Sequence, residues 1–278
     1  MKLTRTLPYS TQGDILGTLY RYENFPSQHI SPRNVDVWFP NGYANSKDGL
    51  PVIYMHDGQN LFDPSLAFGG VDWSVDEVIS SLIDANRIPP VIVVGIWNTA
   101  DRWEEYMPQK PMEQSSIIRT HFREYSSGDP ISDHYLNFLV DELKPFIDST
   151  YPSLNDRQHT FIMGSSMGAL VSLYALETYP LVFGGAACIS THWLAGMSPL
   201  VDSLGENLPT PGKHRFYFDY GTLTLDEGYE PYQQRMDEHL ENAGYSRGKD
   251  WLTYKFEGAA HDEYSWKKRL YIPLEFLL

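Results

Sequence analysis

The sequence has little of what secreted disulfide scaffolds, nucleic-acid-binding proteins and membrane proteins need. Its 278 residues include one cysteine, Cys188, so no disulfide can form within the chain. Lys and Arg number 21 against 36 Asp and Glu, and the net charge of −15 would repel a phosphate backbone or an anionic membrane. No apolar run approaches the ~20 residues of a membrane span. We therefore expect neither a nucleic-acid partner nor a membrane association.

The first residues, from Met1 to Ser10, also lack the apolar core of a secretory signal. As numbered, the chain is expected to be cytoplasmic, unless an export segment has been removed. The pattern gives no indication of the oligomeric state.

What is present is an alternation of apolar runs with helical patterns, in a chain that is 42% hydrophobic. This alternation predicts an α/β protein with a mostly parallel central sheet and helices on both faces, in a single domain over 1–278. Antiparallel strands are expected within the first ~30 residues. The predicted strands are 35–39, 52–56, 91–96, 159–163, 185–189, 215–220 and 252–256. The predicted helices are 73–86, 133–149 with a kink at Pro145, 167–178 and 230–242.

Residues 98–130 form a long segment with scattered aromatic residues and prolines and no clean period. Long insertions of this kind in compact domains are usually functional or disordered. We interpret the segment as a lid or substrate-binding insertion, with a variable surface loop as the alternative.

A nucleophile elbow is predicted at Gly164-Ser165-Ser166-Met167-Gly168. A serine between two glycines, after an apolar strand and before a helix, suits a sharp strand-to-helix turn that exposes its hydroxyl. The motif alone is weak, and its strand-turn-helix context gives it weight. Ser166 is therefore the candidate nucleophile.

The partners of Ser166 should follow strands, because parallel sheets bind ligands outside the carboxyl ends of their strands. His261, directly after the last predicted strand in a run of small residues, is the candidate base. His192 follows the strand 185–189 but precedes every plausible acid, whereas α/β-hydrolases run Ser, acid, His. We interpret His192 as pocket lining.

The acid should come from the region of the strand 215–220 and the loop that follows it. Asp226 is our choice because it is short and lies past Gly221, and Asp219, Glu227 and Glu230 remain open.

Two backbone N–H groups are expected to form an oxyanion hole: that of Met167, after the nucleophile, and that of Gln59, in the turn after the strand 52–56. A metal site at His56, Asp57 and Asp63 matches no zinc or calcium spacing, so no metal or other cofactor is predicted.

Taken together, several motifs resemble the putative esterase family of α/β-hydrolases, which includes esterase D-like, feruloyl and enterochelin esterase-like proteins. The resemblance covers most of the chain from about Val35. Its carriers are 54–62, 89–96, Asn98 with Arg102, Glu105, Tyr106 and Pro108, 164–168, 219–222, and 258–261 with Trp266.

The resemblance implies an α/β-hydrolase fold and a Ser-acid-His site, with Ser166 as nucleophile, His261 as base and the N–H groups of Gln59 and Met167 as oxyanion hole. Relatives often have an acid two to four residues after the Gly of Gly-Thr, where this chain has Leu223 and Thr224. This departure puts in doubt which residue of this chain corresponds to the acid of the family.

We therefore predict a serine carboxylesterase that cleaves carbohydrate or small-molecule esters. Substrate-binding roles are assigned to Trp73, Arg102, Tyr106 and His192, although aromatic side chains of this kind also serve as core and Arg102 could be a surface ion pair. The alternatives are an acyltransferase that uses the same acyl-enzyme and a noncatalytic binding protein of the same fold.

Overall fold

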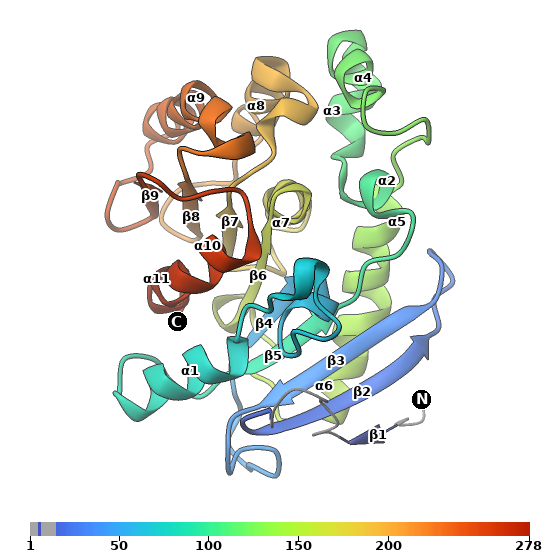
Figure 1. Cartoon of the computed structure of the whole chain (residues 1–278), viewed down its shortest axis with the longest axis vertical. Coiled ribbons are helices and arrows are strands. Elements are labelled where there is room, and N and C mark those ends of the chain that lie inside the picture. The colour runs from blue at the N-terminus through green and yellow to red at the C-terminus, as the bar shows by residue number, and fades with distance from the viewer. Residues whose placement is uncertain (1–4, 7–14) are drawn as a thin grey trace. The chain divides into compact units, whose positions relative to one another are not determined.

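The structure, a computed structural model, describes residues 5–6 and 15–278 of the chain (Figure 1). The backbone contacts divide the chain into two compact units. The first unit comprises residues up to 99 together with 138–161 and 262–278, and the second comprises 100–137 and 162–261. Each is described below by itself, and the expectation of a single domain over 1–278 stays a prediction.

The sheet of the first unit has the strand order β1-β2-β3-β5-β4. Neighbouring strands from β1 to β5 in this order pair antiparallel, and β4 pairs with β5 parallel. Every residue of β4 and β5 is buried, which explains why both are continuous apolar runs. Their predicted positions are confirmed to within two residues, as is an antiparallel strand before residue 30. The bounds are β1 (Arg5–Thr6), β2 (Thr18–Phe25), β3 (Arg33–Phe39), β4 (Val52–His56) and β5 (Ile92–Ile96).

The helices of the first unit are α1 (Val75–Asp84), α6 (Lys144–Thr150), α10 (Glu263–Arg269) and α11 (Tyr271–Leu277). The predicted kink near Pro145 takes the form of a π-helical segment, Phe138–Leu143, directly before α6. Proline has no N–H and its ring clashes with the carbonyl four residues earlier. Residue 141 lies inside the π segment, so the wider turn accommodates the ring where a regular helix would not.

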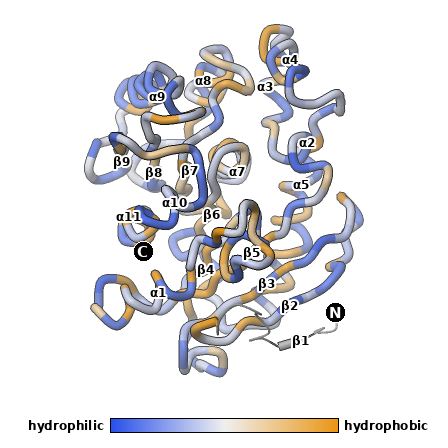
Figure 2. Tube along the Cα trace, viewed as in Figure 1, coloured by the Kyte–Doolittle hydropathy of each residue, from blue (hydrophilic) through white to orange (hydrophobic). Residues whose placement is uncertain are grey.

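In the second unit the strands β7, β8 and β9 pair parallel and follow the end of β6 in the sheet order. Helix α7 packs on β7, and α8 packs on α9. Ten of the twelve residues of α7 are buried, whereas α9 is largely hydrophilic along its trace (Figure 2). The bounds are β6 (Thr160–Ser165), β7 (Gly185–Ile189), β8 (Arg215–Tyr220), β9 (Trp251–Lys255), α7 (Met167–Thr178), α8 (Met197–Gly205) and α9 (Glu230–Asn242).

The insertion is more regular than its sequence indicates. It contains α2 (Arg102–Tyr106), α3 (Gln109–Gln114) and α4 (Ser116–Phe122), and α5 (Ser132–Asn137) follows it. Its completely or almost completely buried hydrophobic side chains are those of Tyr106, Met107, Met112, Ile118 and Phe122. Helices α3 and α4 also contact α8. The segment is therefore packed, whereas its role as a lid stays a prediction.

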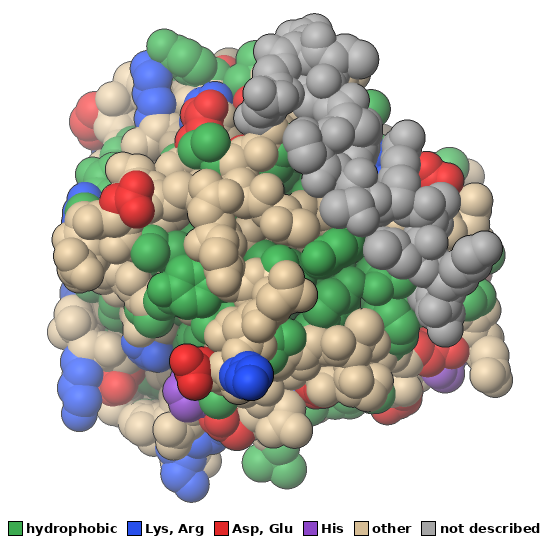
Figure 3. Space-filling view, turned by 90° about the horizontal axis from the view of Figure 1, so that it is seen from below, with side chains coloured by type: hydrophobic (Ala, Val, Ile, Leu, Met, Phe, Trp, Pro, Cys, Tyr) green, Lys and Arg blue, Asp and Glu red, His purple; other side chains and the backbone are tan. Residues whose placement is uncertain are grey.

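On the face drawn in Figure 3, acidic and basic side chains are scattered among polar and hydrophobic ones and do not gather in one patch. Within the described residues, no helix combines the length and the hydropathy needed to cross a bilayer.

Candidate active site

Ser166 stands in the turn between β6 and α7 with a backbone φ of 57° and ψ of −122°. Such a conformation is strained for a residue with a Cβ. A Cβ at Gly164 would lie 2.7 Å from the carbonyl carbon of Gly168, so the strand and the helix can approach this closely only with glycine at position 164. The Ser166 N–H donates to the Ile189 carbonyl at 2.9 Å, which anchors the turn to β7. The turn at Ser166 therefore combines a positive φ with a close approach of strand and helix at Gly164.

The side chains of His261 and Ser166 meet although 95 residues separate them in the sequence. The distance from His261 Nε2 to Ser166 Oγ is 2.9 Å, and the distance from His261 Nδ1 to Asp226 Oδ1 is 2.6 Å. This arrangement fits a histidine that donates from Nδ1 to the carboxylate and accepts the serine proton at Nε2.

Asp226 is buried, and three groups donate to its carboxylate. Besides His261, the hydroxyl of Ser190 and the N–H of Gly221 each approach Oδ2 at 2.6 Å. Burial by itself would raise the pKa of Asp226, but the hydrogen bonds and the charge of His261 outweigh it and the pKa is lowered. The carboxylate is thus held ionised and fixed in orientation.

The sequence patterns did not predict the contact of Ser190 with Asp226. Ser190 directly follows β7, is completely buried and has a positive φ of 45°. Its position at a strand end beside the predicted acid loop is the signal that could have found it, since no motif marks it.

The loops that carry the acid and the base are tied together. The carbonyl of Ala259 accepts from the N–H groups of Thr222 and Leu223, each at 3.0 Å. The Thr224 hydroxyl accepts from the N–H of His261 at 2.9 Å. A Cβ at Gly221 would lie 2.2 Å from the Ala259 oxygen, so glycine is required there. Leu223 and Thr224 stand where relatives often have an acid. In this chain they form hydrogen bonds to the loop that carries His261.

The other candidate acids lie elsewhere. Asp219 accepts from the hydroxyl of Tyr217 at 2.9 Å, as expected of a structural residue within the strand. Glu227 is exposed, and Glu230 pairs with Lys255 at 3.1 Å. Asp226 is therefore the one of the four that the structure places at His261 Nδ1.

His192 lies beside this group in the second unit. Its backbone N–H donates to the carbonyl of Ser166 at 3.2 Å, and its ring centre is 6.4 Å from that of His261. Burial, followed by the nearby charges of His261 and Arg102, lowers the pKa of His192 to about 3. The ring is therefore neutral at physiological pH.

The two predicted oxyanion donors belong to different units. Met167 is the first residue of α7, where helix N–H groups have no partner inside the helix. Gln59 lies in the 3₁₀ turn Gly58–Asn60 of the first unit. Its side-chain oxygen accepts from the N–H of Asn98 at 3.2 Å, and the Asn98 amide donates to Asp57 at 2.6 Å. Asn98 therefore holds this turn in shape.

The remaining predicted substrate-binding residues have contrasting surroundings. Trp73, in the first unit, is 3% exposed and packs against Trp266 with ring centres 5.8 Å apart. Arg102 is half-buried, and its guanidinium lies 5.1 Å from the centre of the Tyr106 ring. Tyr106 itself has no exposed surface, so in this conformation its position is one in the core of the insertion and offers no surface for a substrate.

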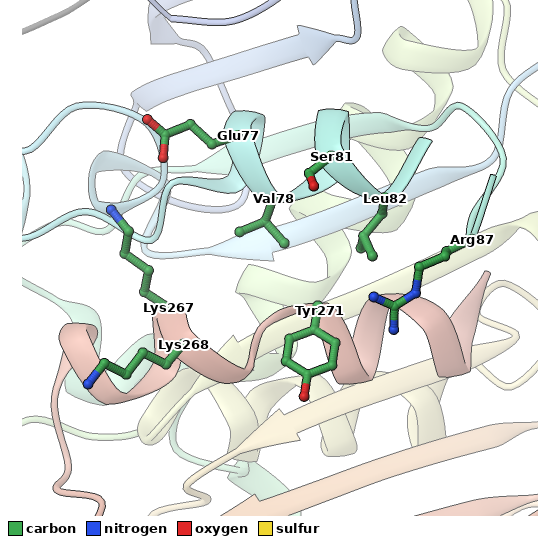
Figure 4. Close-up of a pocket in the computed structure, with 8 residues that line it drawn as sticks. All are labelled: Glu77, Val78, Ser81, Leu82, Arg87, Lys267, Lys268 and Tyr271. Atoms are coloured by element: carbon green, nitrogen blue, oxygen red, sulfur yellow. The ribbon is translucent and has the colours of Figure 1, made fainter. Parts of the chain in front are cut away.

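A surface groove of about 350 Å³ lies between α1 and α10–α11 in the first unit (Figure 4). Val78 and Leu82 of α1 face Tyr271 of α11 across it. Two of its basic side chains are paired, Arg87 with Glu275 and Lys267 with Asp72, so much of its positive charge is neutralised. Among the described residues no group of three or more His, Cys, Asp or Glu is arranged to hold a metal ion.

Comparison with known proteins identifies the family. The sequence profile of the family described as Putative esterase matches residues 28–270. The chain belongs to this family. The uncharacterised protein YbbA of Bacillus subtilis is 23% identical over 255 residues, which are 88% of this chain and 92% of YbbA.

Solved structures agree with that assignment. A ferulic acid esterase matches with a TM-score of 0.67 at 18% identity, over 94% of this chain and 98% of that chain. An IroE-like serine hydrolase from Shewanella oneidensis matches with a TM-score of 0.68 at 21% identity, over 92% of this chain and 78% of that chain. The predicted α/β-hydrolase fold is confirmed, and the family supports ester hydrolysis as the activity.

Proposed function

We propose that this protein is a serine carboxylesterase that works through an acyl-serine intermediate. The observation that carries the proposal is the continuous hydrogen-bonded series from Ser166 Oγ through His261 to Asp226, with distances of 2.9 and 2.6 Å. A serine in a strained turn and a histidine oriented by a buried carboxylate are the parts that nucleophilic acyl transfer needs. The name of the similar IroE-like serine hydrolase agrees with this reading.

In the first half of the reaction, Ser166 Oγ bonds to the ester carbonyl carbon while its proton passes to His261 Nε2. The N–H group of Met167 donates to the oxyanion that forms, and that of Gln59 stays the predicted second donor. The C–O bond to the alcohol then breaks, and Nε2 returns the proton to the departing oxygen. Asp226 stabilises the imidazolium in between and remains ionised.

In the second half, a water molecule gives a proton to Nε2 and attacks the acyl carbon. The bond to Ser166 Oγ breaks, Oγ recovers the proton, and the carboxylic acid leaves. The substrate class in this proposal is a small-molecule or carbohydrate ester, bound near His192 and Arg102 of the second unit.

A fluorophosphonate probe followed by intact-mass spectrometry and peptide mapping tests the proposal. Wild-type protein should gain one adduct, on Ser166, and lose its activity on chromogenic acetyl, butyryl and feruloyl esters in parallel. The Ser166→Ala variant should gain none. Ester hydrolysis that persists in Ser166→Ala would overturn the serine mechanism.

An added small alcohol separates hydrolysis from transfer. A hydrolase releases free acid as the main product, whereas an acyltransferase diverts the acyl group to the alcohol. The ratio of acid to new ester, measured by chromatography, distinguishes the two activities on the same acyl-enzyme.

A further inference from the structure

His192 is held at its place by contacts on both its backbone and its ring. Its backbone N–H donates to the Ser166 carbonyl, and its Nδ1 lies 2.6 Å from the hydroxyl of Tyr229 in α9's preceding turn. The side chain is 1% exposed, and the ring of Tyr229 is completely buried. The imidazole therefore has a fixed orientation next to the nucleophile and the base.

The Tyr229 contact determines which nitrogen of His192 carries the proton. Burial raises the pKa of Tyr229, so its phenol keeps a proton that must be donated. His192 Nδ1 is the acceptor that the described residues offer it. If Nδ1 carried the ring proton instead, both that phenol proton and the lone pair of Nε2 would be left without a partner. The proton of His192 therefore sits on Nε2.

That Nε2–H donor has no acceptor within the described part of the chain, and it is shielded from solvent. Buried polar groups nearly always have a hydrogen-bond partner, so an exception beside a reactive group calls for an explanation. Because the ring is neutral, the group is a hydrogen-bond donor and not a fixed charge.

Two aromatic residues of the insertion contact the His192 ring. The rings of Trp103 and Tyr125 stack on each other with centres 4.9 Å apart, and both contact His192 edge-on, at 5.8 and 5.1 Å. Tyr125 is 36% exposed and Trp103 is half-buried, whereas Tyr229 on the other side is fully covered. Because Nε2 has almost no accessible surface in this conformation, a ligand can reach it only after neighbouring side chains move.

We propose that His192 Nε2–H is a specificity determinant that donates to a second oxygen on the alcohol portion of the ester, next to the scissile oxygen. The inference rests on the proposed function. His261 returns a proton to the departing alcohol oxygen, so that oxygen must lie at His261 Nε2. Because the two imidazole centres are 6.4 Å apart, we take the oxygen bound to His192 to belong to the carbon next to the one that carries the departing oxygen. The alcohols of choice are therefore vicinal diols, polyols and their ethers.

Three esters of one acyl group test this inference: ethyl, 2-hydroxyethyl and 2-methoxyethyl butyrate. For the wild type, kcat/KM on both oxygen-bearing esters should exceed that on the ethyl ester about tenfold, which corresponds to one neutral hydrogen bond. The His192→Phe variant should lose this preference, and His192→Gln, which keeps an N–H donor, should retain part of it. Equal values for the three esters in the wild type, or an undiminished preference in His192→Phe, would overturn the inference.

Tyr229→Phe tests the position of the proton. Without the phenol, Nδ1 can take the proton and Nε2 becomes an acceptor, so the preference for the methoxyethyl ester should fall while that for the hydroxyethyl ester remains. An equal preference for both esters in this variant would contradict the assigned tautomer. Fluorophosphonate labelling of Ser166 in each variant reports a folded active site. Failure of the proposed function itself would appear differently, as no adduct and no turnover of any of the three esters.

Discussion

The turn at Asp57 and the turn at Ser166 both begin with a positive φ directly after a strand, and they offer different groups. Asp57 directly follows β4 with a φ of 56°, and Ser166 directly follows β6 with a φ of 57°. Each turn also needs a glycine against backbone, since a Cβ at Gly58 or Gly164 would lie 2.6 or 2.7 Å from the nearest atom. Both strand ends thus turn at a positive φ. The ψ angle is 45° at Asp57, within the left-handed region that aspartate tolerates, and −122° at Ser166, outside that region, so the strain is greater at Ser166.

The two turns also differ in the side chain at the residue with positive φ, Asp57 in one and Ser166 in the other. The carboxylate of Asp57 is tied back by the amide of Asn98, so what this turn has to offer is backbone N–H groups. The hydroxyl of Ser166 points to an imidazole from another loop, so this turn offers a reactive side chain. Backbone strain therefore sets the direction of a group, and the surrounding contacts decide which group is used.

The largest effect is expected at the Ser166 hydroxyl. Ser166→Ala should lower kcat by a factor on the order of 10⁶, because the nucleophile is removed while the rest of the site remains. The free energy of unfolding should change little, since alanine occupies the same backbone conformation. Ester assays and urea unfolding measure the two quantities. A variant that still turns over esters would show that the Ser166 hydroxyl is not the nucleophile, so the turn would offer no reactive side chain.

The Asp226 carboxylate comes next. Asp226→Asn should lower kcat by about 10⁴, because an amide no longer fixes the tautomer of His261. Glu227→Gln is the matched control, since Glu227 is the adjacent carboxyl on the same turn and is exposed. Steady-state kinetics of both variants provide the measurement. An equal loss in the two variants would mean that the acid is misassigned.

A smaller loss is expected at the Asp57 turn. Gly58→Ala places a Cβ against the backbone of Gly95 and Ile96, at 2.6 and 2.7 Å, so the turn must shift and take the Gln59 N–H with it. Loss of one oxyanion donor lowers kcat by about 10²–10³.

Gly228→Ala is the control for that variant, because its Cβ would meet Leu194 at an ordinary 3.8 Å. Thermal melts of both variants separate a lost donor from a lost fold. Wild-type kcat in a folded Gly58→Ala protein would remove Gln59 from the site.

The smallest effect concerns Asn98. Asn98→Ala removes one hydrogen bond to Asp57, so the turn loosens and kcat/KM should fall about tenfold, or about 1.4 kcal/mol. Asn207→Ala, at an exposed residue whose amide bonds locally to Ser203, is the comparison variant. If the two variants behave alike in a kinetic assay, Asn98 has no part in positioning the turn.

The elements that the sequence predicted well are those whose pattern is local. Strands such as Val52–His56 and Gly185–Ile189 are largely apolar, with His56 as the polar end of the first, because buried parallel strands bury both faces. Helices α2 to α4 and α8 were not predicted. They are five to nine residues long, and α3 and α8 contain Pro111 and Pro199. Such helices are marginal by themselves and depend on tertiary packing.

The residues of the candidate site also fall into those that a local sequence pattern indicates and those that it does not. The glycines around Ser166 are a local requirement of the elbow, and chain order together with strand-end position indicated His261. Ser190 and Tyr229 have no local signature, because each acts through a partner more than thirty residues away in the sequence.

The sequence by itself determined the strained serine turn and the kind of sheet that presents it, since close backbone approach and apolar runs are written in neighbouring residues. Only the tertiary structure decided between Asp226 and Glu227. Adjacent residues of a 3₁₀ turn point about 120° apart, so one carboxylate reaches His261 and Ser190 while the next faces water. Which carboxylate reaches His261 depends on where loops distant in sequence meet, so the spacing of residues along the chain cannot predict it.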